Sequence, residues 1–167
     1  MKNAYIVDSI RTPIGNFKGT LAAVRPDDMA AMTIAELVKR NPSLDTKNIG
    51  DVILGNANGA GEENRNVARM SALLAGLPHS VPGETVNRLC SSGLASAIHA
   101  SRSLILSDSN VMIAGGVESM SRAPYVVSKS AQPWGNSAEM FDSAFGWRFV
   151  NPKMHEMYGT DGMGNTA

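Results

Sequence analysis

Residues 86–94 read Val-Asn-Arg-Leu-Cys-Ser-Ser-Gly-Leu, and within them the sequence passes from a strand to a helix. The pattern of residues 84–89 is typical of a strand, whereas the small residues of 91–106 predict a helix that another backbone can approach closely. Cys90 falls at the junction. Open α/β sheets bind their ligands outside the carboxyl ends of the strands, so we expect a functional site at this junction.

The same alternation of strands and helices runs through the chain as far as residue 117. Strands are predicted over residues 4–10, 51–57, 84–89 and 110–117, and helices over residues 26–40, 67–74 and 91–106. Pro26 at a first helical position, followed by two acidic residues, is a strong signal for a helix start. The order predicts right-handed parallel crossovers, and hence an α/β fold with a mostly parallel sheet and helices on both faces.

The pattern changes after Glu118. Residues 121–167 contain both tryptophans and little periodicity, and a helix over residues 137–144 is the only element that the sequence predicts there. An irregular stretch of this length is uncommon inside a compact domain. We therefore expect an α/β unit over residues 1–121 and the beginning of a second, irregular unit over residues 122–167.

The composition disfavours several classes of protein. Lys plus Arg and Asp plus Glu each number 15 among 167 residues, so the formal net charge is zero. Without a basic cluster, we do not expect nucleic acid as a partner. No apolar run approaches the ~18 residues of a membrane span, and the early charge at the N-terminus argues against a signal peptide. The single cysteine cannot form an intramolecular disulfide, which favours a cytoplasmic, reducing location.

Cys90 is the candidate nucleophile. At a helix N-terminus, unpaired backbone amides stabilise a thiolate, and they can also bind an oxygen that becomes negative on an attacked carbonyl. The alternative is a buried core cysteine, which is the more common use of a single thiol. The residues alone leave both interpretations open.

A nucleophilic cysteine needs a base, and the three histidines are the first candidates. His99 is nine residues along the helix, roughly 13 Å from Cys90 at about 1.5 Å per residue. His79 precedes the strand whose far end leads to the cysteine, and His155 lies in the irregular stretch. We therefore expect the base to lie outside these residues. The dispersed histidines and the single cysteine also predict no metal site.

Four stretches of the sequence resemble motifs of the thiolases. They are residues 87–94, Gly-Gly-Val-Glu-Ser-Met-Ser over 115–121, Asp-Ser-Ile-Arg-Thr-Pro-Ile-Gly over 8–15 and Asn-Arg-Asn-Val-Ala-Arg over 64–69. Their order and separations match over essentially the whole chain. Residues 60–66 and 146–152 are most similar to the 3-oxoadipyl-CoA thiolases of aromatic degradation.

The resemblance implies a CoA-dependent acyl transfer. Cys90 would attack the keto carbon of a 3-oxoacyl-CoA, acetyl-CoA would leave, and free CoA would take the shortened acyl group, with Claisen condensation as the reverse reaction. The resemblance also implies that the Cys90 amide forms part of an oxyanion hole, that Met163 borders the acyl pocket and that the residues after 121 begin a loop domain over the substrate. CoA is then a substrate, and no bound cofactor is expected.

Thiolases also have a second half, which supplies a histidine, an asparagine and a second cysteine in motifs that do not occur in this sequence. The resemblance therefore implies an N-terminal portion that is inactive alone. It implies self-association as well, as a dimer or a tetramer. Gly162 stands where biosynthetic members usually have histidine, which disfavours an acetoacetyl-CoA thiolase.

Three alternatives stay beside this interpretation. They are an acetoacetyl-CoA thiolase, a ketosynthase whose substrate is attached to a carrier protein, and a non-catalytic binding module. The stretch over residues 115–121 favours a thiolase over a ketosynthase.

Overall fold

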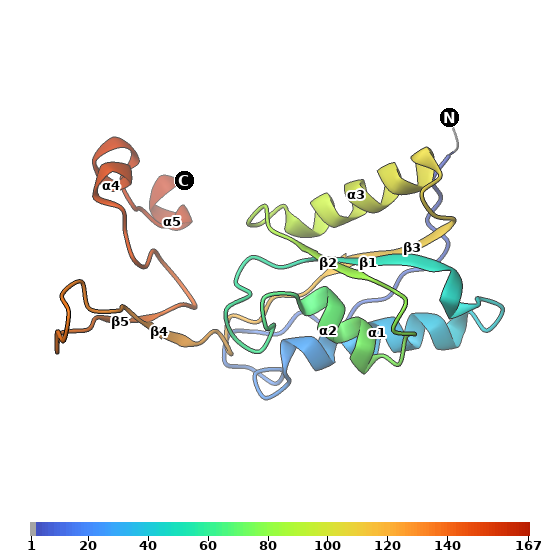
Figure 1. The fold of residues 1–167 in the computed structure, drawn as a ribbon, viewed down its shortest axis with the longest axis horizontal. Helices are drawn as coiled ribbons and strands as arrows, with labels where there is room; N and C mark the ends of the chain where they lie inside the picture. The colour runs from blue at the N-terminus through green and yellow to red at the C-terminus, as the bar shows by residue number, and fades with distance from the viewer. Residues whose placement is uncertain (1–2) are drawn as a thin grey trace. The chain divides into compact units, whose positions relative to one another are not determined.

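The computed structural model describes residues 3–167 and divides them into two compact units (Figure 1). The first unit ends at Arg122, and the second comprises Ala123–Ala167. This division lies one residue beyond the boundary expected from the sequence. That the second unit belongs to a loop domain over the substrate stays a prediction.

The first unit is built on a parallel sheet with the strand order β2-β1-β3. The strands are β1 (Ile49–Gly55), β2 (Gly83–Val86) and β3 (Val111–Gly116). Ile53 in the central strand is paired with Glu84 of β2 and with Ala114 of β3. The predicted parallel crossovers are confirmed, because each connection returns the chain to the same end of the sheet before the next strand begins.

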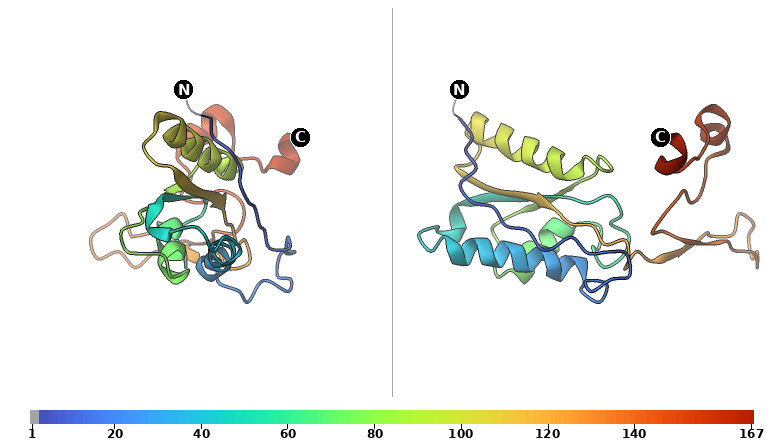
Figure 2. Two further views of the ribbon diagram at one scale, coloured as in Figure 1. Left: turned by 90° about the vertical axis from the view of Figure 1, so that its right-hand side faces the viewer. Right: turned by 180° about the vertical axis from the view of Figure 1, so that it is seen from behind.

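Helices cover both faces of this sheet, as the sequence predicts (Figure 1, Figure 2). They are α1 (Pro26–Arg40), α2 (Val67–Leu74) and α3 (Ser92–Leu106), and a 3-10 turn, η1 (Thr46–Asn48), precedes β1. Helices α1 and α2 lie on one face and α3 lies on the other. Ile34, Val52 and Val67 belong to the core under α1 and α2, whereas Ile53 and Ala95 belong to a smaller core under α3.

Helix α1 begins where the sequence predicts it. Pro26 lies in its first turn, Asp27 and Asp28 stabilise the positive end of the helix dipole, and Asn41 ends the helix. The Ser71 hydroxyl of α2 donates a hydrogen bond to the carbonyl of Asp27 at 3.1 Å. The start of α1 is therefore fixed against α2.

The predicted strand over residues 4–10 is wrong. These residues form no regular element and pair with no strand among residues 3–167, and Ile6 is 92% exposed. Asp8 instead contacts the end of α1, where its carboxylate accepts a hydrogen bond from Asn41 at 2.9 Å and pairs with Arg40 at 3.0 Å. Alternating apolar residues form a strand only where a partner supplies ladder hydrogen bonds and side-chain packing. The described residues provide no such partner.

The second unit consists of short elements. Strand β4 (Tyr125–Val127) pairs antiparallel with β5 (Met140–Asp142), and helices α4 (Pro152–Tyr158) and α5 (Met163–Thr166) follow. The predicted helix over residues 137–144 is therefore wrong. Phe141 of β5 pairs with Val126, and its ring packs edge-on against Phe149 with the centroids 5.2 Å apart. Such contacts outweigh a weak helical pattern, because an isolated helix this short is unstable in water. None of the helices formed by residues 3–167 is long and apolar enough to cross a membrane.

Candidate active site

The loops that follow the three strands of the first unit meet at the carboxyl end of the sheet. Asn56 follows β1, Cys90 lies in the turn after β2, and Glu118 follows β3. The Asn56 backbone amide donates to the carbonyl of Val86 at 3.0 Å, and its side chain donates to the carbonyl of Val117 at 2.8 Å. The predicted position of Cys90, between the end of a strand and the start of a helix, is confirmed.

The backbone turns sharply just before Cys90. Leu89 has a φ of 51°, in the left-handed region that a bulky side chain rarely adopts. The Ser92 hydroxyl accepts a hydrogen bond from the Arg88 amide at 2.8 Å and donates one to the carbonyl of Leu89 at 2.6 Å. The Ser92 side chain therefore bridges the two residues before Cys90 and stabilises the turn.

Cys90 is exposed, so the alternative of a buried core cysteine is wrong. Within the described part of the chain, the thiol makes no hydrogen bond. Ser91 is the cap residue of α3, and its side chain makes no capping hydrogen bond to the amides of the first turn. The thiol is therefore accessible and lies beside the positive end of a helix dipole.

Small residues hold α3 against the sheet. At Gly55 a Cβ atom would overlap the backbone of Ser92, so only glycine lets the start of α3 lie on the end of β1. The Ser96 hydroxyl donates a hydrogen bond to the carbonyl of Gly115 in β3 at 2.6 Å. The predicted close approach of another backbone to this helix is confirmed. These contacts fix the start of α3, and with it Cys90, relative to the sheet.

The three histidines do not contact the thiol. His99 lies in the middle of α3, where its ring is 3.3 Å from a carboxylate oxygen of Glu84. His79 lies in the exposed loop before β2. His155 is part of α4 rather than of an irregular stretch, and its ring is 3.4 Å from the hydroxyl of Thr160. Among residues 3–167, no base is hydrogen-bonded to Cys90.

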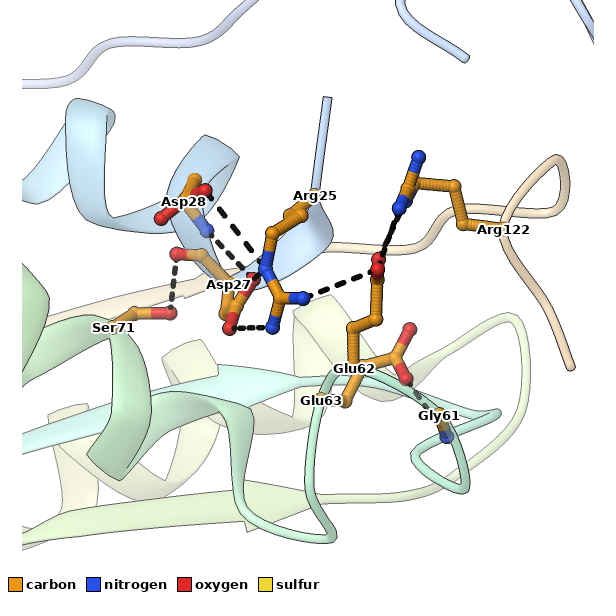
Figure 3. A network of polar contacts seen from close by, with 8 residues as sticks. All are labelled: Arg25, Asp27, Asp28, Gly61, Glu62, Glu63, Ser71 and Arg122. Carbon is orange, nitrogen blue, oxygen red and sulfur yellow. Dashed lines mark hydrogen bonds and ion pairs between the residues drawn. The ribbon is translucent and has the colours of Figure 1, made fainter. Parts of the chain in front are cut away.

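A network of ion pairs holds the loop between β1 and α2 (Figure 3). Arg122 donates two hydrogen bonds to Glu62, each at 2.5 Å, and Arg25 donates another at 3.2 Å. Arg25 also pairs with Asp27 at 2.7 Å. The hydrogen bonds from Arg122 lower the pKa of Glu62, whereas burial raises the pKa of the adjacent Glu63. Because Arg122 is the last residue of the first unit, this network fixes the point where the chain leaves that unit.

Met163 is the first residue of α5 in the second unit and is 78% exposed. Its position beside an acyl pocket stays a prediction. In the first unit, a groove of about 430 Å³ lies between residues 10–17 and β3, but Cys90 does not line it. The exposed thiol, rather than the size of a cavity, therefore marks the candidate site. Residues 3–167 contain no cluster of three or more His, Cys, Asp or Glu that could hold a metal ion.

Comparison with known proteins agrees with this fold. The family model described as the thiolase N-terminal domain matches residues 4–167. The chain belongs to the thiolase family. Within this family it is 58% identical to the 3-oxoadipyl-CoA/3-oxo-5,6-dehydrosuberyl-CoA thiolase of Escherichia coli K12 and 57% identical to a beta-ketoadipyl-CoA thiolase of Acinetobacter baylyi. Both alignments cover 100% of this chain and 42% of the relative, so the chain spans less than half the length of these thiolases.

A solved structure supports the same assignment. The acetyl-CoA acetyltransferase of Bacillus anthracis superposes with a TM-score of 0.70 and is 38% identical in sequence. The match covers 80% of this chain and 34% of the acetyltransferase. The predicted thiolase-like α/β fold and the predicted similarity to 3-oxoadipyl-CoA thiolases are both confirmed.

Proposed function

We propose that this chain carries the nucleophile of a CoA-dependent acyltransferase that cleaves a 3-oxoacyl-CoA, with 3-oxoadipyl-CoA as the substrate. The observation that supports this most is the exposed Cys90 at the start of α3, in a chain 58% identical to a thiolase named for that substrate. A thiol on a strained turn at the carboxyl end of a parallel sheet is well placed to attack a bound substrate.

The reaction has two steps. The Cys90 thiolate adds to the C3 carbonyl of the 3-oxoacyl-CoA, the C2–C3 bond breaks, and the departing acetyl-CoA takes up a proton at C2. The acyl group stays on Cys90 as a thioester. The thiol of a second CoA loses its proton and attacks that thioester, which releases the shortened acyl-CoA and regenerates the thiolate. In the reverse direction, the two steps form a Claisen condensation.

Residues near the thiol stabilise charge in both steps. The backbone amide of Cys90 forms part of an oxyanion hole, and the amides of the first turn of α3 stabilise the thiolate. Met163 borders the acyl group. The base and the acid for the C2 proton come from outside residues 3–167, in which no base is hydrogen-bonded to Cys90. CoA enters as a substrate rather than as a bound cofactor.

The chemistry of the thiol also bears on the compartment in which the enzyme works. The nucleophile is active only as a reduced thiol, so a reducing compartment such as the cytoplasm suits it. We also propose that the protein associates with itself, as a dimer or a tetramer.

A second candidate function is the thiolysis of acetoacetyl-CoA. The superposition on an acetyl-CoA acetyltransferase favours it, but that protein is 38% identical, against 58% for the 3-oxoadipyl-CoA thiolase. We therefore rank it second. The match of the whole chain to thiolases disfavours the ketosynthase and the binding module.

The choice between these substrates is testable in the whole protein that carries this chain. We expect kcat/KM for thiolysis of 3-oxoadipyl-CoA to exceed that for acetoacetyl-CoA at least about tenfold, measured as CoA-dependent loss of the 3-oxoacyl-CoA. A preference for acetoacetyl-CoA would assign the second function. The absence of thiolysis with either substrate would contradict both.

A further inference from the structure

Glu118 ends the Gly-Gly-Val-Glu motif, and its carboxylate organises the neighbouring loop. One oxygen accepts a hydrogen bond from the Ala57 backbone amide at 2.7 Å. The other oxygen accepts from the Asn58 amide at 3.2 Å and from the Asn56 side chain at 3.3 Å. A carboxylate that accepts from several amides makes charge-assisted hydrogen bonds, which are stronger than neutral ones. Glu118 therefore fixes the orientation of the Ala57 peptide.

The Ala57 carbonyl is connected through hydrogen bonds to the turn that contains Cys90. Its carbonyl accepts a hydrogen bond from the Asn87 side-chain amide at 3.0 Å. The carbonyl oxygen of the same Asn87 side chain accepts from the Leu89 backbone amide at 2.9 Å. The side chain of Asn87 thus bridges the loop after β1 and the residue directly before Cys90.

Leu89 is the residue that most needs such support. Its φ of 51° is in a region that bulky residues avoid, so surrounding contacts must hold it there. Ser92 holds its carbonyl on one side of the turn, and Asn87 holds its amide on the other. Loss of the contact through Asn87 would leave the backbone before Cys90 held from one side only.

We propose that Glu118 is a positioning residue for Cys90, acting through Ala57 and Asn87 to hold the Leu89 turn in the conformation that aims the thiol. This inference rests on the proposed function, because it assumes that Cys90 attacks a substrate. Glu118 does not touch the reacting atoms in this account. A small displacement of a nucleophile can reduce a rate about 100-fold, so indirect positioning is measurable.

The test is a double-mutant cycle in the whole protein with Glu118→Ala and Asn87→Ala. We expect each single variant to lower kcat for thiolysis about 10-fold to 100-fold with KM changed less than about twofold. Because both residues act in one chain of contacts, the double variant should be no slower than the slower single variant. Glu118→Gln, which keeps an acceptor for the Ala57 amide, should recover most of the lost kcat.

Glu62→Gln is the matched control. Glu62 holds the same loop through Arg122 and Arg25 but has no recorded link to Asn87 in the described chain. We expect this variant to keep kcat within about twofold and to change the kcat of Asn87→Ala by the same small factor when the two are combined. Circular dichroism and an unfolding midpoint for each variant show whether a loss of kcat reflects loss of folded protein.

The same cycle is run on a second readout, the rate constant for alkylation of Cys90 by iodoacetamide. It requires no thiolase activity, so it separates this inference from the proposed function. We expect both single variants to change the alkylation rate in the same direction by at least about threefold, and the double variant to equal a single one. If thiolysis is absent in the wild type but this coupling is present, only the proposed function fails.

Three results would overturn the inference. One is a Glu118→Ala variant with kcat and alkylation rate within about twofold of the wild type. Another is a double variant whose losses multiply, which would make the two residues independent. The third is a Glu118→Gln variant as slow as Glu118→Ala with an altered pH profile of kcat, which would make Glu118 an acid or base in contact with the substrate.

Discussion

The two units of the chain differ in how much of their surface they bury. In the first unit, Ile34, Val52 and Val67 are at most 1% exposed and form one core with the faces of α1 and α2. In the second unit, the buried residues among 123–167 are Ser143 and Ala144, and Trp134 is fully exposed. The first unit thus holds Cys90 on a packed sheet and helix, whereas the second unit has almost no core of its own. A reactive group needs such a rigid support to stay aimed at its substrate.

The largest expected effect is the loss of activity when the thiol of the first unit is removed. Cys90→Ala should lower kcat for thiolysis of 3-oxoadipyl-CoA by at least about 10³-fold, because no other described group can form the acyl thioester. Ser91→Ala is the matched control, since Ser91 is also exposed and makes no capping hydrogen bond. We expect its kcat to stay within about threefold. A Cys90→Ala variant with more than about 1% of wild-type activity would contradict the role of the thiol.

The next effect tests the difference in packing itself. Ile34→Ala in the first unit should lower the free energy of unfolding by about 2–5 kcal/mol, because it removes buried methyl groups and leaves a cavity. Trp134→Ala in the second unit should change it by less than about 0.5 kcal/mol, because the indole already lies in solvent. Urea unfolding followed by circular dichroism measures both. Similar losses in the two variants would mean that the second unit buries Trp134 after all.

The smallest effect concerns the end of the first unit, where Arg122 donates hydrogen bonds to Glu62. Glu62→Gln should destabilise the protein by about 1 kcal/mol at neutral pH, because it removes the charge that Arg122 and Arg25 share. The pKa of Glu62 in the folded protein is below the ordinary value of 4.5, so the wild type holds this stability above that pH and loses it as the pH falls.

The difference in unfolding free energy between wild type and Glu62→Gln should therefore shrink as the pH falls below 4.5. Glu36→Gln serves as the control, because the side chain of Glu36 is more exposed and its contact with Lys39 is longer, at 3.7 Å. We expect that variant to differ from the wild type by less than about 0.5 kcal/mol at every pH. A constant difference for Glu62→Gln over the same pH range would contradict the assigned charge interaction.

The sequence predicts the first unit well because its signals are local. Pro26 and the two acids after it specify the start of α1, and the change of period at Cys90 specifies the start of α3. Residues 4–10 show the limit of such signals, because a strand needs a partner that the pattern itself does not name. In the second unit, Phe141 joins a strand by pairing with Val126, and its ring packs against Phe149, so its state depends on residues outside its own segment.

The prediction missed one local signal in the second unit, the start of α4. Asn151 followed by Pro152 is a recognisable helix start, and in the structure the Asn151 side chain caps α4 by accepting from the Lys153 amide at 2.9 Å. The candidate site is similar. Cys90 is evident in the sequence, but the hydrogen bond from the Ala57 amide to the Glu118 carboxylate joins residues 61 positions apart. Only the order of the strands in the sheet brings such residues together.

The central claim is that Cys90 of the first unit carries the acyl group. The most direct measurement is to mix the whole protein with 3-oxoadipyl-CoA in the absence of free CoA, quench in acid, digest and locate the acyl group by mass spectrometry. We predict an acyl thioester on the peptide that contains Cys90, which is removed by adding CoA and is absent when the protein is first treated with iodoacetamide. An acyl group on a different residue, or none on Cys90 while acetyl-CoA is released, would contradict the account.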